Sequence, residues 1–168
     1  GSFYYDARMT YAPKGQLKPR DEGFTISKEI SAPDGTPLQE VEAGSLVMVT
    51  LTVVVPQERL FVVVDDPLPA GLEAVNPDFV TASGEARRRM ENMDNNGRRW
   101  WWAGFNHTEI RDDRVLLFAD SLPPGIYTHR YLARALTFGT FHAPGTRVEE
   151  MYSPEVFGRN AEITLRIK

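Results

Sequence analysis

In the stretch Leu46-Val47-Met48-Val49-Thr50-Leu51-Thr52-Val53-Val54-Val55, the side chains alternate between two faces. Valine and leucine occupy every odd position from 47 to 55, and both threonines fall on the even positions. Strict alternation of this kind is typical of a β-strand with one buried face. Residues 56–59 then interrupt the pattern. Residues 60–64 form a second, continuously apolar run that ends at Asp65-Asp66-Pro67 and is typical of a short strand. Together the two runs predict a hairpin.

Similar strand-like runs recur along the chain, separated by turn signals rich in Pro, Gly and Asp. They occupy residues 3–11, 24–30, 72–75, 114–119, 126–136 and 161–167. In the run 126–136, one face is shared by Tyr127, His129, Tyr131, Ala133 and Ala135. Seven or more short strands at this spacing predict an all-β fold, an antiparallel β-sandwich. Residues 83–99 break the pattern and predict a long solvated loop with room for a short helical turn.

Composition narrows the class of protein. The 168 residues are 42% hydrophobic and 25% charged, which suits one domain with a real core. A net charge of −4 argues against a nucleic-acid binder, which would carry a basic surplus to neutralise phosphates. The absence of cysteine excludes disulfides, thiolate metal sites and a thiol nucleophile, but leaves the compartment open.

The ends of the chain predict a fragment of something larger. No apolar run approaches the ~18 residues of a membrane span, and no leader precedes the strand-like run Phe3-Tyr4-Tyr5. Gly1-Ser2 is typical of a cloning scar. We therefore expect residues 3–168 to form a single domain excised from a longer protein.

Catalytic patterns are incomplete in this sequence, and we expect no enzyme, cofactor or metal site. His107-Thr108-Glu109 has the spacing of a zinc deaminase, but that chemistry needs a P-C-x-x-C partner. The three histidines fall in separate segments, which favours structural roles. The paired carboxylates Asp65-Asp66 and Asp112-Asp113 lie at strand ends, where turn formation is a better interpretation than glycoside hydrolysis. No nucleophile elbow, phosphate loop or dinucleotide fingerprint is present.

Two further segments could bind ligands. The arginines of residues 83–99 alternate with acids and asparagines, which favours a solvated loop over an anion site. Trp100-Trp101-Trp102 could form a stacking platform, so a carbohydrate- or peptidoglycan-binding sandwich is the alternative hypothesis for the whole chain. Asn106-His107-Thr108 is formally a glycosylation sequon, which matters only in a eukaryotic secretory setting.

The segment Val148-Glu149-Glu150-Met151-Tyr152-Ser153-Pro154-Glu155 is the most distinctive loop that the sequence predicts. Its pair Met151-Tyr152 joins a pliable thioether to an aromatic ring with a polar tip. Such a pair suits packing against a partner surface. It could equally plug the end of the domain's own core, and the sequence leaves both interpretations open.

Four motifs together resemble a known family. They are Val64-Asp65-Asp66-Pro67-Leu68-Pro69-Ala70-Gly71-Leu72-Glu73, His107-Thr108-Glu109-Ile110-Arg111-Asp112-Asp113-Arg114-Val115 with Phe118-Ala119, Tyr131-Leu132-Ala133-Arg134-Ala135, and Glu150-Met151-Tyr152-Ser153-Pro154-Glu155-Val156-Phe157-Gly158-Arg159. On these the chain resembles the last, or tenth, macroglobulin-like domain of bacterial alpha-2-macroglobulins, over most of its length.

The resemblance implies a β-sandwich at the C-terminus of a multidomain periplasmic protease inhibitor, whose parent an upstream lipid signal could anchor to a membrane. In thioester-bearing relatives, a loop of this domain presses a methionine over the internal thioester of a helical domain and keeps water away. Carried over by motif, that residue is Met151, with Tyr152, Glu150 and Pro154 beside it in the contact. The implied partners are the parent's thioester-type domain and, through the whole parent, target proteases and other periplasmic proteins.

Overall fold

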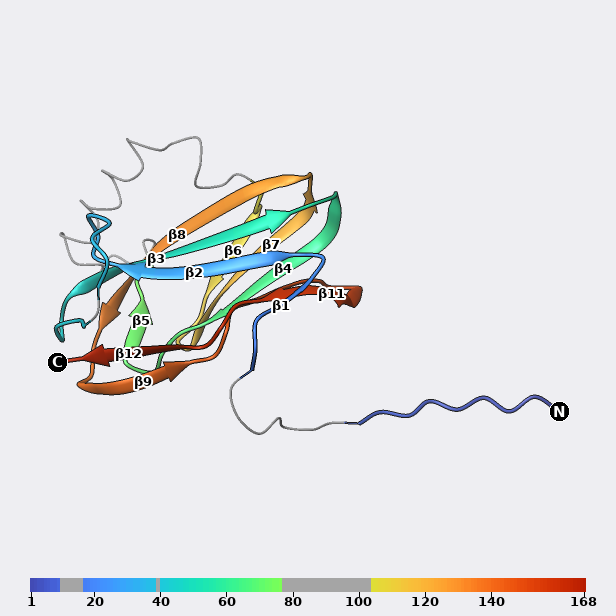
Figure 1. The fold of residues 1–168 in the computed structure, drawn as a ribbon, viewed down its shortest axis with the longest axis horizontal. Helices are drawn as coiled ribbons and strands as arrows, with labels where there is room; N and C mark the ends of the chain where they lie inside the picture. Colours follow the sequence, from blue (N-terminus) through green and yellow to red (C-terminus); the bar gives the residue numbers. More distant parts are fainter. Residues whose placement is uncertain (10–16, 39, 77–103) are drawn as a thin grey trace.

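The computed structural model describes residues 1–9, 17–38, 40–76 and 104–168, and every element assigned in them is a β-strand. Residues 1–9 run away from the body of the domain as an extended arm without strand pairing (Figure 1). The side chains of Phe3, Tyr4, Tyr5 and Met9 are exposed along this arm. The prediction of a strand over residues 3–11 is therefore wrong for its described part, because no neighbouring strand pairs with it.

One layer is a four-stranded antiparallel sheet in the order β2-β3-β8-β5. Its strands are β2 (Thr25–Ser31), β3 (Leu46–Val55), β8 (Gly125–Ala135) and β5 (Leu72–Ala74). All five odd positions of β3 are buried, as the alternation predicts. Beside it, β8 runs antiparallel with Val55 opposite Gly125.

The other layer is a six-stranded sheet in the order β1-β11-β10-β4-β7-β6. Its strands are β1 (Arg20–Glu22), β11 (Ser153–Arg159), β10 (Arg147–Glu150), β4 (Arg59–Pro67), β7 (Arg114–Leu122) and β6 (His107–Ile110). Each neighbouring pair is antiparallel. A separate pair, β9 (Gly139–Ala143) with β12 (Ile163–Ile167), lies along one side (Figure 1).

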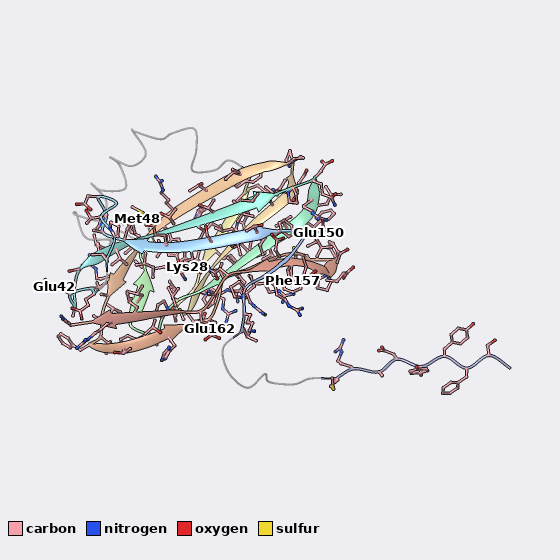
Figure 2. All side chains as sticks on the ribbon, viewed as in Figure 1. Lys28, Glu42, Met48, Glu150, Phe157 and Glu162 are labelled. Carbon is pink, nitrogen blue, oxygen red and sulfur yellow. The ribbon has the colours of Figure 1, made fainter. Side chains whose placement is uncertain are left out.

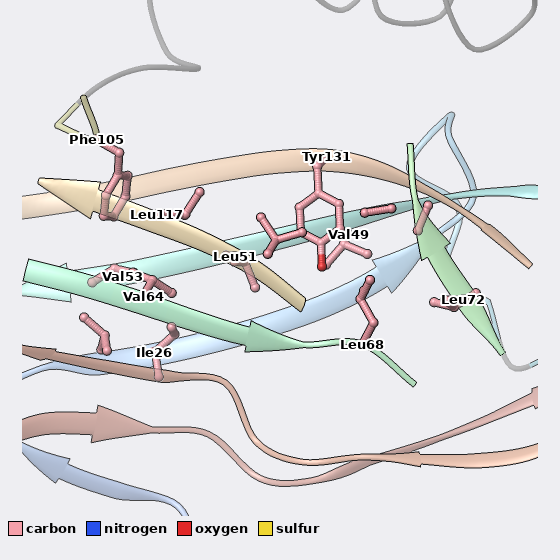
Figure 3. Packing of buried hydrophobic residues seen from close by; sticks show 14 of the residues in the cluster. Ile26, Val49, Leu51, Val53, Val64, Leu68, Leu72, Phe105, Leu117 and Tyr131 are labelled. Atoms are coloured by element: carbon pink, nitrogen blue, oxygen red, sulfur yellow. The ribbon is translucent and has the colours of Figure 1, made fainter. Parts of the chain in front are cut away.

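The hydrophobic core fills the space between the two larger sheets (Figure 3). Sheet β2-β3-β8-β5 contributes Ile26, Val49, Leu51, Val53 and Tyr131, among others. The facing sheet contributes Val62, Val64, Val115, Leu117 and Val148, all fully buried. Burying a single side chain of this size stabilises the fold by about 1.5–3 kcal/mol. The predicted antiparallel β-sandwich is confirmed, and the described residues include no helix.

The predicted hairpin between residues 46–55 and 60–64 is wrong, because β3 pairs with β2 and β8 in one sheet and β4 pairs with β10 and β7 in the other. Strand bounds predicted from alternation were accurate where the pattern was regular. The run 46–55 matches β3, and 126–136 matches β8 to within one residue at each end. The shared face of β8 is also confirmed, because His129, Tyr131, Ala133 and Ala135 are buried and Tyr127 packs on the core. The predicted loop and helical turn within residues 83–99 lie outside the described residues, as does Trp100-Trp101-Trp102.

Candidate contact site at the β10–β11 hairpin

The segment predicted as a loop is a β-hairpin. Strand β10 ends at Glu150, Met151 and Tyr152 form the turn, and β11 begins with Ser153 opposite Glu150. Val148 lies fully buried in the core, so the first part of the segment is sheet rather than loop. The pairing register shifts between Glu149 and Glu150, which leaves extra residues on the β11 side just after the turn.

The two residues of the turn carry their side chains into solvent. Met151 is 48% exposed and Tyr152 is 78% exposed. Neither side chain plugs the core of this domain, which was one of the two interpretations that the sequence left open. Two large apolar groups at the tip of a hairpin are instead available for contact with another surface.

Strand β4 adds two more exposed apolar side chains beside the turn. Leu60 is 52% exposed and Phe61 is 47% exposed. The ring of Phe61 meets the ring of Tyr152 edge-on, with centroids 5.2 Å apart and an interplanar angle of 84°. The backbone N–H of Met151 donates to the carbonyl oxygen of Phe61 at 2.8 Å. We call these four residues, Leu60, Phe61, Met151 and Tyr152, the tip patch.

Sequence reasoning missed the β4 half of the tip patch. The available signal was the pair Leu60-Phe61, two consecutive large apolar residues where strict alternation would allow only one to face the core. In the structure both are exposed, because they lie where β4 emerges from the edge of the core, beside the hairpin.

Glu150 anchors the base of the hairpin rather than its contact face. Its carboxylate lies 3.7 Å from the guanidinium of Arg59, and both side chains are mostly buried. The same guanidinium stacks over the ring of Phe24, 5.4 Å from its centroid, and reaches the carbonyl oxygen of Gly23. Arg59 thus ties the hairpin to the start of the opposite sheet. Figure 2 shows Glu150 at the end of the sandwich away from Glu42.

A second arginine braces the outer face of the hairpin. Arg147 on β10 pairs with Glu149 and lies over the ring of Phe157, 4.3 Å from its centroid. It also donates to the carbonyl oxygen of Pro154 at 3.1 Å. Pro154 is exposed and sits where the register shifts, a position that tolerates a residue without a backbone N–H. The turn is therefore held on both faces before any partner binds.

Buried charge gathers elsewhere, at Asp66. Lys28 donates to its carboxylate at 2.6 Å, and the two side chains are 1% and 0% exposed. Tyr131 and Thr146 each donate a hydroxyl hydrogen bond to it at 2.6 Å, and Lys28 also donates to the carbonyl oxygen of Pro67. We call Lys28, Asp66, Tyr131 and Thr146 the ion cluster. Burial, and then the charge and hydrogen bond of Asp66, raise the pKa of Tyr131 well above its ordinary value.

The prediction that Asp65-Asp66 shapes a turn is therefore wrong, because strand β4 continues through both residues to Pro67. The side chain of Asp66 points into the core. Asp65 takes the alternate face, where it pairs with Arg114 at 2.9 Å. The alternation that buries Val62 and Val64 also buries Asp66, and the cost is offset by three donors around one carboxylate.

The other catalytic candidates do not converge. Asp112 and Asp113 occupy the β6–β7 turn, as predicted, and the hydrogen bond from Arg114 lowers the pKa of Asp113. His107 faces Glu109 across 3.8 Å at the surface, and His142 contacts the hydroxyl of Thr164. Within residues 1–9, 17–38, 40–76 and 104–168, no group of three or more His, Cys, Asp or Glu side chains could hold a metal ion.

The fold and this site define an all-β domain that presents a braced apolar hairpin at one end of a sandwich. Residues 23–155 match the family model described as "Bacterial Alpha-2-macroglobulin MG10 domain", and the chain belongs to this family. The expected resemblance is confirmed. Among the described residues, no helix has the length and apolar character that crossing a membrane requires.

The chain spans about a tenth of the length of the relatives that it matches. It is 32% identical over 180 residues to the alpha-2-macroglobulin homolog of Nostoc sp., covering 100% of this chain and 9% of that protein. It is 33% identical over 147 residues to the alpha-2-macroglobulin of Escherichia coli, covering 85% of this chain and 9% of that one. The crystal structure of trypsin-activated alpha-2-macroglobulin from E. coli superposes with a TM-score of 0.82 at 30% identity, over 93% of this chain and 11% of that chain.

Proposed function

We propose that this domain packs on the helical thioester-type domain of its parent chain through the tip patch. The observation that carries the proposal is the exposure of Met151 and Tyr152 on a hairpin that Arg59 and Arg147 brace. A surface that is ordered before contact loses little conformational entropy on binding. Apolar side chains displayed in this way favour a partner over free solvent.

The chemistry of the tip suits the shielding of a hydrolysable bond. A thioether carries no proton to donate and adapts to an irregular surface, while an aromatic ring covers area with few rotatable bonds. Shielding by such groups excludes water from the space beneath them. In a parent that bears a thioester, Met151 would lie over it. In a parent without one, the same surface would serve as an interdomain contact alone.

The role of the parent follows from its relatives and is part of the proposal. The superposed E. coli protein is described as activated by trypsin, a protease. We infer that the parent of this domain is a periplasmic protease inhibitor whose shape responds to proteolysis. In it the domain would act as an interaction module, with the tip patch as its contact site and Glu150 and Pro154 as hairpin supports.

The oxidation of Met151 tests the contact directly. Hydrogen peroxide converts exposed methionines to sulfoxides, which peptide mass spectrometry locates residue by residue. We define Met151 protection as its oxidation rate in the 168-residue chain divided by its rate in the full-length parent. Met48, which is 5% exposed, supplies the slow reference in both proteins.

We expect Met151 to be oxidised at least about tenfold more slowly in the parent, the change that a contact of roughly 1.4 kcal/mol produces. Tyr152→Ala should lower this protection, whereas Phe138→Ala, which removes an exposed ring in the β8–β9 connection, should not. Equal oxidation rates for Met151 in the two proteins would exclude the contact. Where the parent bears a thioester, Met151→Ala should also speed its spontaneous loss in water.

A further inference from the structure

Phe61 has a backbone conformation that a phenylalanine rarely adopts. Its φ is 51°, and among the described residues it is the one non-glycine residue with a positive φ. In this left-handed region the Cβ of an L-residue crowds the following carbonyl, at a cost of roughly 1–2 kcal/mol. Glycine or asparagine would be the ordinary choice at such a position. Strain of this kind persists only where the surrounding structure imposes it, and it gathers at functional sites.

Sheet pairing around Phe61 does not account for the strain. Leu60 pairs with Ser121 and Val62 pairs with Ala119, so the register between β4 and β7 is the same on both sides of Phe61. On the other edge of β4, Val62 pairs with Glu150. The strand is therefore in register with both neighbours, and no inserted residue needs to be accommodated on β4 at this point.

Phe61 contacts both residues of the turn. Its carbonyl oxygen accepts a hydrogen bond from the N–H of Met151 at 2.8 Å, in the register of the β10–β4 pairing, and its ring lies edge-on against Tyr152. Both residues of the turn are thus held by this single residue of β4. Leu60 extends the same apolar surface, while the neighbouring charges of Arg59 and Glu150 neutralise each other below it.

We propose that Phe61 is a positioning residue for the contact site and that it acts through the ring of Tyr152. This inference rests on the proposed function, because it concerns the same surface. The ring of Phe61 holds Tyr152 in the orientation that meets the partner. The occupant is an apolar, weakly charged surface of the parent's thioester-type domain, since the exposed centre of the tip patch carries no unpaired charge.

Substitutions at Phe61 separate the ring from the backbone strain. Phe61→Gly and Phe61→Asn both remove the ring and accept a positive φ, so the 168-residue chain should keep its thermal midpoint or gain slightly. In the full-length parent, the same variants should lower Met151 protection by about three- to tenfold, the range expected for an edge-to-face aromatic pair. Phe61→Tyr keeps the ring and should retain the protection of the wild type.

A double-mutant cycle then tests whether Phe61 acts through Tyr152. In the Tyr152→Ala parent, Phe61→Gly should cause no further loss of Met151 protection. A further loss as large as that in the wild-type background would overturn the positioning role, because Phe61 would then contribute on its own. Full protection in both Phe61→Gly and Phe61→Asn would overturn it as well.

The failure of this inference can be told apart from the failure of the proposed function. If Tyr152→Ala lowers Met151 protection and the ring-deleting Phe61 variants do not, the contact exists and Phe61 does not position it. If the wild-type parent shows no Met151 protection, the contact itself is absent and both proposals are wrong.

Discussion

Charged side chains usually lie at the surface of a domain and large apolar side chains in its core. The ion cluster and the tip patch are each an exception to one half of this rule. The ion cluster buries a lysine and an aspartate at 1% and 0% exposure in the core. The tip patch exposes four large apolar side chains at the end of the sandwich. In the ion cluster, Lys28, Tyr131 and Thr146 all donate to one carboxylate, whereas the tip patch presents apolar area that this chain leaves open to solvent.

The two regions differ in role: the buried charges stabilise the fold, and the exposed apolar side chains offer a contact surface. A buried carboxylate with three donors has its partners inside the chain, and it joins β2, β4, β8 and the segment before β10. The exposed hairpin needs no such partner to hold its shape, because Arg59 and Arg147 brace it. Substitutions in the ion cluster should therefore change stability, and substitutions in the tip patch should change contact.

The largest expected effect is that of Asp66→Ala. The substitution leaves the ammonium of Lys28 buried without its counter-charge, and we expect the free energy of unfolding to fall by about 3–5 kcal/mol. Urea denaturation of the 168-residue chain measures it. Asp113→Ala, at the exposed β6–β7 turn, is the matched control and should leave the midpoint nearly unchanged. Equal midpoints for the two variants would contradict the structural role of the ion cluster.

A smaller loss is expected for Tyr131→Phe at neutral pH. The variant keeps the ring in the core and removes only the hydroxyl that donates to Asp66. Hydrogen bonds to charged groups contribute roughly 1.5–3 kcal/mol, and the same urea titration should show a loss of that size. Tyr127→Phe is a suitable control, because its hydroxyl donates to the carbonyl oxygen of Pro123 at the surface. A loss for Tyr127→Phe as large as that for Tyr131→Phe would argue against a special role for the buried hydroxyl.

At alkaline pH, the wild type should lose the extra free energy of unfolding that it has over Tyr131→Phe. The pKa of Tyr131 is raised in the folded state, so below its unfolded pKa of about 10 both states are protonated and the full contribution is present. Above that pH the unfolded state releases its proton first, and stability falls as pH rises. Lys28 and Asp66 are present in both proteins, so the difference between the two stabilities isolates the hydroxyl of Tyr131. A difference that stays constant through pH 10 and above would contradict the raised pKa.

The smallest expected effect on the fold is that of Met151→Ala. Because its side chain is about half exposed at a turn, we expect the free energy of unfolding of the 168-residue chain to change by no more than about 0.5 kcal/mol. Met48→Ala should cost far more, since Met48 is 5% exposed on β3. If Met151→Ala destabilised the chain as strongly as Met48→Ala, the tip would belong to the core and the comparison between the two regions would fail.

The sequence predicts most of the sandwich because alternation of side chains is a local property. Residues 46–55 reveal β3 without any knowledge of its neighbours, and the shared face of β8 follows in the same way. Residues 148–155 look like a loop because Glu149, Glu150 and Ser153 interrupt the apolar pattern. Their pairing with β4 and with each other depends on strands distant in sequence, which local patterns do not contain.

Local sequence patterns also fail to predict part of the candidate site. Met151 and Tyr152 could be singled out from their motif and their chemistry, but the backbone conformation of Phe61 could not be predicted, because a positive φ at phenylalanine contradicts every local preference. Asp66 was misinterpreted for a related reason. Its position beside Asp65 and Pro67 is typical of a turn, and only the folded structure brings Lys28, Tyr131 and Thr146 to its carboxylate.

The pairing of β10 on both of its edges has a mechanical consequence. Strand β10 is hydrogen-bonded to β4 on one edge and β11 on the other, and such antiparallel bonds lie perpendicular to the strands. A pull on the tip along the strand axis loads these bonds together in shear, whereas a sideways pull opens them one after another. Force along the hairpin is therefore shared with β4 and β11 and is not carried by the turn alone.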